Sequence, residues 1–346
     1  MTYPDLSGVR RILVAKLRHH GDVLLTTPLF SALKRAVPQA RIDAYIYAES
    51  APLLRTHPDI EELILYDRGA RRRGVVARYR HELEVLRKIR KGGYDIVINL
   101  TEGDRGAIAA KVSKAPIRVG FDPKGSGMKG KSSFYTHIVC HGHAPRHTVE
   151  KQLDAARVLG IFPDVEQREL SLPVSAEVEE KIASYRGAVV VHPVSRWMFK
   201  ALPSKTMIEV IGELEKRGER VIITASPDPS EMAMGEEIGR ASSASLLAGE
   251  TTLEEMAALV KGAKLLITLD SLPLHMASVY KTPVVALFGP TSEVTWGPWR
   301  HPRARAVTDT ISCRPCFQRG CGGSGRSDCL EQVTARAILR AVSEVV

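Results

Sequence analysis

A carboxylate, a hydroxyl and an imidazole follow one apolar run in the second half of the chain. Residues 265–268 are typical of a buried parallel strand; Asp270 and Ser271 come after them, and His275 about one helical turn later. The residues up to 280 favour a helix, whose first backbone N–H groups, with the imidazole, would suit a phosphate. The alternative is helix capping and a core histidine. No G-x-S-x-G elbow surrounds Ser271, so a serine hydrolase is not indicated.

A second polar loop follows the apolar run 189–191. It carries one hydroxyl, Ser195, and two cations, Arg196 and Lys200, before the helix expected over 205–217. A positive loop that leads into a helix favours a phosphate ligand. An ordinary solvated loop is the alternative.

Asp22 is the candidate acid–base residue of the first half. It follows the apolar run 12–15 and a short loop, at the expected start of a helix. It is either a helix cap or a carboxylate at the edge of a sheet, able to take a proton from a hydroxyl. The loop lacks G-x-G-x-x-G, so a dinucleotide there is not expected.

Four cysteines lie close together near the end of the chain, at 313, 316, 321 and 329. Such a group can bind zinc or an iron–sulfur cluster, but this spacing fits no standard site well. We therefore favour reduced structural thiols and expect no metal. Five cysteines in a chain without a secretion signal also indicate a reducing compartment.

Positive charge is concentrated in two stretches of the first half. Residues 68–91 hold ten Lys and Arg against two Glu, and the Gly-rich stretch 124–131 reads KGSGMKGK. The chain as a whole carries +10. The stretches are either a solvated helix face with a mobile loop or a surface for an anionic partner: nucleic acid, membrane or a phosphorylated substrate.

The elements that carry these residues alternate between strands and helices in both halves of the chain. This pattern predicts an α/β protein with two doubly wound sheets. We expect a first domain over 1–170, a linker over 171–186, a second domain over 187–330 and a last helix over 331–346 that packs back on the first domain. We expect neither a signal peptide nor a membrane-spanning segment.

Several motifs together resemble one family, the ADP-heptose:lipopolysaccharide heptosyltransferases of glycosyltransferase family 9. They are RRILVAKLRHHGDVLLTTPL, HPVSRWMFKALP, TLDSLPLHMAS and LFGPTSEVTWGPW. The strings RWMFK and GCGGSGRSDC look most like the third heptosyltransferase of the inner core. The resemblance implies a GT-B fold, in which two Rossmann-like domains face each other across a cleft, and a donor nucleotide held mainly by the second domain.

The resemblance also assigns roles to residues. Asp22 matches the family's catalytic base. The residues matched to the donor phosphate and sugar are Ser195, Arg196, Lys200, Asp270, Ser271, Leu272 and His275. Those matched to the nucleotide are Asp228 or Glu231 for the ribose and Leu247, Gly249 and Thr251 for adenine. Two positions depart from the family: Leu202 and Leu272 stand where relatives often have Trp and Gly.

The resemblance implies an inverting transfer from ADP-heptose to a heptose of the lipopolysaccharide inner core, with no cofactor required. We expect acceptor binding by Arg71, Arg72, Arg73, Lys124, Lys129 and Lys131. The location implied is cytoplasmic, peripheral on the inner membrane, without nucleic acid. The alternatives are transfer of another nucleotide-linked sugar, a basic nucleic-acid-binding protein and a non-catalytic sugar-nucleotide-binding protein.

Overall fold

The chain folds into two compact units, 1–173 and 174–346. The structure, a computed structural model, describes residues 3–140, 142 and 144–346, with every side chain in these ranges except that of Arg71. Each unit is built around a six-stranded sheet in which all paired strands run parallel. The predicted α/β class is therefore confirmed.

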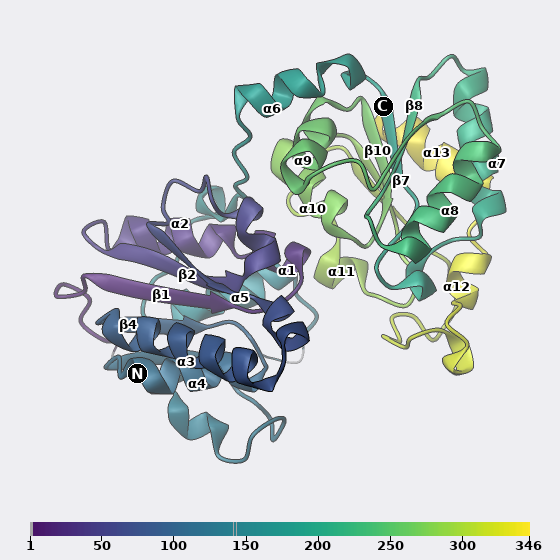
Figure 1. Ribbon diagram of the computed structural model, residues 1–346. Coiled ribbons are helices and arrows are strands. Elements are labelled where there is room, and N and C mark those ends of the chain that lie inside the picture. The colour runs from purple at the N-terminus through teal and green to yellow at the C-terminus, as the bar shows by residue number, and fades with distance from the viewer. Residues whose placement is uncertain (1–2, 141, 143) are drawn as a thin grey trace. The chain divides into compact units, whose positions relative to one another are not determined.

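The first sheet has the strand order β3-β2-β1-β4-β5-β6. Its strands are β1 (Arg11–Lys16), β2 (Arg41–Tyr47), β3 (Glu62–Tyr66), β4 (Ile96–Asn99), β5 (Ile117–Phe121) and β6 (His137–Val139). The helices are α1 (His20–Leu24), α2 (Thr27–Ala36), α3 (Val75–Lys91), α4 (Asp104–Ser113) and α5 (Thr148–Arg157). In Figure 1, α3 and α4 cover one face of the sheet and α2 and α5 the other. The order reverses between β1 and β4, and ligands of such sheets bind at the carboxyl ends of the strands at this point.

The second sheet repeats this topology with the order β12-β11-β10-β7-β8-β9. Its strands are β7 (Val189–His192), β8 (Val221–Ala225), β9 (Ser245–Ala248), β10 (Leu265–Leu269), β11 (Val284–Leu287) and β12 (Ala304–Val307). The helices are α6 (Ala176–Lys181), α7 (Ser204–Lys216), α8 (Pro229–Arg240), α9 (Leu253–Gly262), α10 (Leu272–Tyr280), α11 (Glu293–Trp296), α12 (Asp328–Glu331) and α13 (Ala335–Val345). The order reverses between β7 and β10, so the loops that follow these two strands share one edge.

The last helix belongs to the second unit. The sequence predicts that residues 331–346 pack on the first domain, but α13 packs against β11, β12 and α7. Its buried residues Ile338, Val342 and Val345 join the core that also contains Val285 and Leu287. The apolar side of α13 therefore completes the core of its own unit.

The stretch expected as a linker is largely folded. The chain divides after Pro173, and α6 then packs against α9. The contact carries an ion pair between Lys181 and Glu255 and another between Lys261 and Glu179, at 2.5 Å. Most of the expected linker, 171–186, is therefore part of the second unit.

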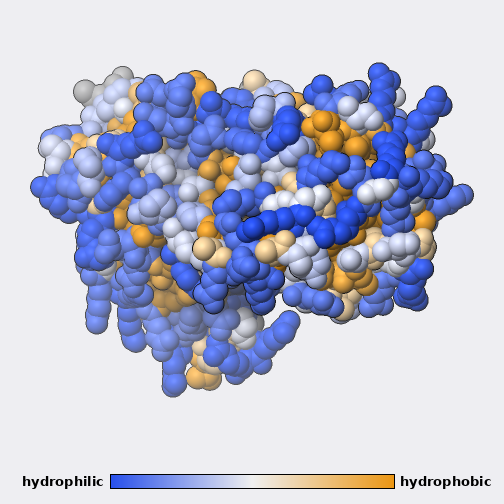
Figure 2. Space-filling model, turned by 90° about the horizontal axis from the view of Figure 1, so that it is seen from above, coloured by the Kyte–Doolittle hydropathy of each residue, from blue (hydrophilic) through white to orange (hydrophobic). Residues whose placement is uncertain are grey.

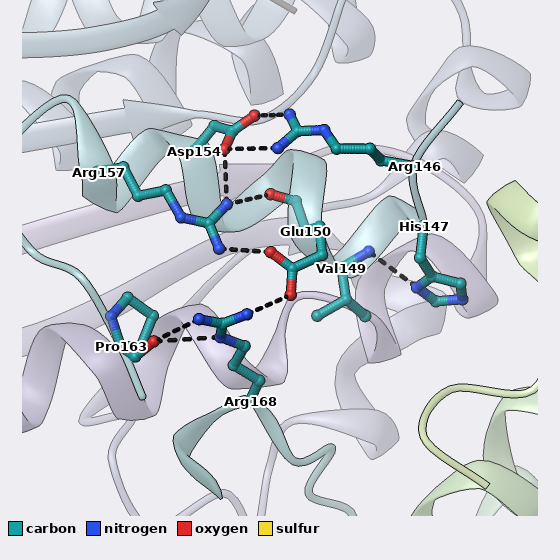
Figure 3. Close-up of polar contacts among 8 residues, drawn as sticks. All are labelled: Arg146, His147, Val149, Glu150, Asp154, Arg157, Pro163 and Arg168. Atoms are coloured by element: carbon teal, nitrogen blue, oxygen red, sulfur yellow. Dashed lines mark hydrogen bonds and ion pairs between the residues drawn. The ribbon is translucent and has the colours of Figure 1, made fainter. Parts of the chain in front are cut away.

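A network of charged side chains fixes α5 to the segments on either side of it (Figure 3). Asp154 accepts hydrogen bonds from Arg146 and Arg157. Arg157 also pairs with Glu150, which accepts a bond from Arg168 at 2.9 Å. Burial alone would raise the pKa of Asp154, but the hydrogen bonds from the two arginines outweigh it and hold that pKa below its ordinary 3.8. The network therefore needs an ionised carboxylate.

Asp154→Asn is expected to lower the free energy of unfolding of the first unit by about 1–2 kcal/mol at neutral pH. Because the folded-state pKa of Asp154 is depressed, its contribution is present above the ordinary value of 3.8 and is lost as the pH falls through the folded value. Urea titrations at pH 7 and pH 3 would measure it. Glu166→Gln, at an exposed carboxylate of the same unit, is the control. A difference from wild type that persists undiminished at pH 3 would contradict the electrostatic account.

Most of the visible surface is polar. Figure 2 shows hydrophilic residues over much of the face in view, with apolar residues in smaller groups between them. Within residues 3–140, 142 and 144–346, no helix combines the length and the apolar character needed to cross a bilayer.

Candidate functional site

The two polar loops singled out in the second half lie at one edge of the second sheet. β7 and β10 are adjacent in register, with His192 beside Thr268 at their carboxyl ends. The loop with Ser195 and Lys200 therefore leaves the sheet next to the turn with Asp270 and Ser271. This is the point at which the strand order reverses, where a parallel sheet leaves room for a ligand.

Lys200 and Asp270 form the central contact of this edge. The ammonium Nζ of Lys200 lies 2.7 Å from Oδ2 of Asp270 and 3.5 Å from its carbonyl oxygen. Both side chains are largely enclosed, at 17% and 8% exposure. A partly buried ion pair needs good geometry to offset the loss of hydration. The carboxylate therefore holds the cation at the sheet edge.

The loop between β7 and Lys200 is shaped by Ser195 and Trp197. Ser195 is buried, and its Oγ accepts a hydrogen bond from the Trp197 backbone N–H at 3.4 Å. The exposed Arg196 lies beside the Trp197 ring, 5.7 Å from its centroid. Arg319 lies 5.1 Å from the same ring. Two cations thus lie beside the partly exposed ring of Trp197. The sequence analysis names Arg196 but neither Trp197 nor Arg319.

The turn after β10 leads directly into α10. Ser271 occupies the N-cap position, but its side chain makes no capping bond; its Oγ lies 3.1 Å from Oγ1 of Thr268 instead. Leu272 opens the helix and is half-buried, and His275 is buried in it. The capping alternative therefore does not describe the Ser271 side chain, whereas the burial of His275 agrees with a core position.

His192 is a buried polar residue at this edge that sequence reasoning did not place in the site. Its Nδ1 lies 3.0 Å from Oγ1 of Thr224, and burial lowers its pKa to about 4. The imidazole is therefore neutral at pH 7 and adds no charge at this edge of the sheet. Its position as the last residue of an apolar strand could have indicated from the sequence that it lies at the sheet edge.

The residues matched to the nucleotide lie on the loops after β8 and β9. Asp228 caps α8, accepting from the Ser230 backbone N–H at 3.0 Å, and its hydrogen bonds from Ser230 lower its pKa. Glu231 is buried and accepts from the Ser226 N–H at 3.2 Å. Asp228 is the more accessible of the two carboxylates.

The two loops are joined at Gly249. This residue has a φ of +71°, which favours glycine, and its N–H donates to the Ala225 carbonyl at 2.9 Å. Leu247 and Thr251 lie on either side of it and are half-buried. The loops with the predicted ribose and adenine residues are therefore neighbours.

The cysteine-rich segment ties two loops of the sheet edge together. The guanidinium of Arg314 donates to the Gly289 carbonyl at 2.6 Å and pairs with Glu293 at 3.1 Å. Ser327 donates to the Phe199 carbonyl at 2.7 Å. The segment thus contacts the loops after β11 and β7. The spacing of the cysteines in the sequence does not predict these contacts between the segment and the two loops.

The cysteines themselves are free thiols. Burial raises the pKa of the Cys329 thiol, which favours the protonated form. In the part of the chain that the structure describes, no three His, Cys, Asp or Glu side chains gather as metal ligands would.

Asp22 lies at the corresponding edge of the first sheet, where the order of β1 and β4 reverses. It is the third residue of α1, whose N-cap is His19, so the capping alternative is wrong. Its Oδ1 lies 3.8 Å from Nζ of Lys16, and the side chains are 14% and 8% exposed. Lys16 also donates to the Leu100 carbonyl at 3.2 Å. Burial lowers the pKa of Lys16, while the Asp22 carboxylate opposes that shift.

The cations expected to bind the acceptor differ in accessibility. Arg72, Lys124 and Lys129 are exposed; Arg73 is exposed and pairs with Asp67; the side chain of Arg71 lies outside the described part. Lys131 is buried.

Lys131 makes contacts inside the fold. Its ammonium donates to the Glu102 carbonyl at 2.7 Å and pairs with Asp104 at 3.3 Å. The predicted mobile loop is therefore anchored at this end, and Lys131 borders a hollow of about 280 Å³ as part of its wall. A lysine among glycines looked mobile because the sequence does not show these distant acceptors.

Comparisons with known proteins show the family of the chain. A profile described as glycosyltransferase family 9 (heptosyltransferase) matches residues 83–324. Lipopolysaccharide heptosyltransferase 3 of Escherichia coli K12 is 33% identical over 297 residues, which cover 82% of this chain and 83% of the relative. Lipopolysaccharide heptosyltransferase 2 of Salmonella typhimurium is 26% identical over 95% of this chain and 96% of its own.

Solved structures show the same fold. A glycosyl transferase family 9 structure from Veillonella parvula matches with a TM-score of 0.83 and 23% identity, covering 99% of this chain and 98% of its own. E. coli ADP-heptose heptosyltransferase II matches with a TM-score of 0.77 and 22% identity, over 97% and 98%. The predicted GT-B fold with two Rossmann-like domains is confirmed. The chain belongs to glycosyltransferase family 9, the heptosyltransferase family, and is a glycosyltransferase.

Proposed function

We propose that this glycosyltransferase transfers heptose from ADP-heptose to a heptose of the lipopolysaccharide inner core, with inversion at the anomeric carbon. The observation that carries the proposal is the Lys200–Asp270 pair at the strand-order reversal of the second sheet. The identity of 33% to a lipopolysaccharide heptosyltransferase 3 supports the choice of sugar and acceptor.

The second unit holds the donor in this proposal. Negative charge develops on the diphosphate as the bond to the sugar breaks, and fixed positive groups at that point lower the barrier. Lys200 and Arg196 supply charge, Ser195 and Ser271 supply hydroxyl donors, and the start of α10 supplies its dipole. Leu272 and His275 flank the sugar in this assignment, Asp228 or Glu231 binds the ribose, and Leu247, Gly249 and Thr251 surround the adenine. The leaving diphosphate is thus stabilised by the chain's own groups.

The first unit supplies the base. The Asp22 carboxylate takes the proton from the acceptor hydroxyl as its oxygen attacks the anomeric carbon, and the bond to the ADP oxygen breaks. Lys16, 3.8 Å away, orients the carboxylate. The enclosed position of Asp22 removes much of the surrounding water, which strengthens its interaction with the attacking hydroxyl.

The acceptor is anionic and lipid-linked in this proposal, and the protein acts at the cytoplasmic face of the inner membrane. Arg72, Arg73, Lys124 and Lys129 present exposed charge for the phosphates and acidic sugars of such a molecule. Lys131 would act through the loop that it anchors rather than by direct contact. Arg71 completes the basic run in the sequence.

Transfer from ADP-heptose to a set of truncated core oligosaccharides tests the proposal. We expect transfer to one defined hydroxyl, with the linkage and its inverted configuration read by NMR. ADP-linked hexoses, offered in parallel, are the control. Preferred transfer of a hexose would identify a different sugar specificity, and saturable ADP-heptose binding without transfer to any acceptor would overturn the catalytic proposal.

A further inference from the structure

Helix α3 presents an apolar face to solvent. Val75, Val76, Tyr79 and Leu83 are 69%, 75%, 63% and 50% exposed. The spacing 75, 79, 83 places these side chains along one face of a helix, with Val76 beside them. Four of the thirteen large apolar side chains described as exposed therefore lie within nine residues.

This face is separate from the one that builds the core. Val85 and Ile89 of the same helix are buried with the apolar residues beneath it. Glu82 is half-buried, accepts a hydrogen bond from Tyr66 at 3.0 Å and pairs with Arg105 at 3.1 Å. Residues 68–91 contain two carboxylates, those of Glu82 and Glu84. Because the carboxylate of Glu82 is bound to Tyr66 and Arg105, it does not neutralise the arginines on the outer side of the helix.

The charge around the exposed face is strongly positive. Residues 68–91 hold ten Lys and Arg against two Glu, in a chain whose total is only +10. Arg80 and Arg87 are exposed on the same helix, Arg72 is exposed just before it, and Arg73 beside Arg72 is exposed but pairs with Asp67. The rest of the chain is therefore close to neutral, and this segment carries nearly all of the excess.

We propose that α3 lies in the plane of an anionic phospholipid bilayer, with Val75, Val76, Tyr79 and Leu83 inserted at the headgroup–acyl boundary. The surrounding arginines would bind lipid phosphates, to which the guanidinium geometry is well suited. The apolar and cationic groups share one outward surface of α3, because Val75, Val76, Tyr79 and Leu83 line a single hollow with Arg80 and Arg87. A helix of low overall hydrophobicity that combines apolar side chains with Lys or Arg is typical of interfacial binding. This inference rests on the proposed lipid-linked acceptor, and it assigns the membrane contact to one helix.

Charge complementarity calls for a polyanionic partner, and the exposed aliphatic side chains favour a bilayer over a nucleic acid. A polyphosphate backbone would use the arginines but would leave Val75, Val76 and Leu83 in water. Single-stranded nucleic acid binds by stacking on aromatic rings, and this face offers one, Tyr79. A bilayer with acidic headgroups satisfies both the cations and the aliphatic side chains.

Co-sedimentation of the full chain with vesicles tests the inference. Vesicles of phosphatidylethanolamine with phosphatidylglycerol should bind the wild type at least about tenfold more tightly than vesicles of phosphatidylcholine, and added salt should weaken the binding. The double variant Val76→Asp with Leu83→Asp should bind the anionic vesicles at least about tenfold more weakly. Val165→Asp, at another exposed valine of the first unit, is the matched control and should bind as wild type.

A charge-reversal variant separates insertion from simple electrostatic attraction. Arg80→Glu with Arg87→Glu should also weaken vesicle binding. If this variant loses binding while the Val76→Asp, Leu83→Asp variant binds as wild type, the surface is electrostatic only and the insertion is overturned. Equal binding of the wild type to both kinds of vesicle would overturn it as well.

Transfer to a delipidated, soluble core oligosaccharide distinguishes this inference from the proposed function. Val76 and Leu83 lie outside the proposed catalytic groups, so the double variant should keep wild-type turnover on that acceptor. Normal turnover with unchanged vesicle binding would overturn only the membrane inference. Vesicle binding as expected, without turnover by the wild type, would overturn only the proposed function.

Discussion

Asp22→Asn is expected to lower the transfer rate by about 10²- to 10⁴-fold, the usual contribution of a positioned general base. The amide keeps the size and the hydrogen-bonding shape of the carboxylate but does not accept the proton of the attacking hydroxyl. Because the proposed donor groups all lie in the second unit, the affinity for ADP should stay close to wild type. Turnover from initial rates and ADP affinity from calorimetry measure the two quantities separately.

The substitution also removes the partner of Lys16, so folding must be monitored. Burial already lowers the pKa of Lys16 and Asp22 opposes that shift, so the amide should lower this pKa further. The thermal midpoint at several pH values would report that effect apart from catalysis. Glu102→Gln, at a 76% exposed carboxylate after the neighbouring strand β4, is the control and should retain turnover. A rate for Asp22→Asn within a few fold of wild type would show that Asp22 is not the base.

The central strands could be predicted from the sequence because each is a continuous apolar run buried on both faces. β1, β4, β7 and β10 are of this kind. β6 and β12, at sheet edges, have three and four residues and mixed burial, so no periodic signal marks them. The alternation of strong strands with helices was sufficient for the fold class without them.

The places of the candidate residues at the sheet edges could be predicted, but their partners could not. Asp22, Lys200 and Asp270 are candidates because each follows a strong strand. The sequence does not show that Lys200 contacts a carboxylate seventy positions away, since that contact depends on the order of β7 and β10 in the sheet. Asp and Ser are common helix caps, so residue type alone suggested capping by Asp22 and Ser271. In the structure Asp22 lies inside its helix, and the Ser271 hydroxyl contacts Thr268.

The sequence also does not show which side chains of α3 are exposed. The ten cations of residues 68–91 are visible in the sequence. The exposure of Val76 and Leu83 is not, because the alternating apolar residues of this helix would equally suit burial. The structure assigns Val85 and Ile89 to the core and the others to solvent, which turns a basic stretch into an amphipathic one.

Lys200→Met is expected to weaken ADP binding by about 100-fold, since it removes the enclosed cation nearest to the proposed diphosphate. Two effects contribute: the phosphate loses a charge-assisted hydrogen bond, and Asp270, 8% exposed, is left as an unpaired carboxylate beside an anionic ligand. Calorimetry with ADP at constant ionic strength measures the loss. Lys205→Met, at an exposed lysine of the following helix, should bind ADP as wild type.

The double variant Lys200→Met with Asp270→Asn separates these two effects. If Lys200 contacts the phosphate, removing the Asp270 charge restores only part of the affinity, because the missing hydrogen bond is not replaced. Full recovery would mean that Lys200 acts only by neutralising Asp270. Unchanged ADP affinity in Lys200→Met alone would remove Lys200 from the phosphate site. Lys200→Arg, which keeps the charge but changes the geometry, should lie between Lys200→Met and the wild type, because a guanidinium can still pair with both the carboxylate and the phosphate.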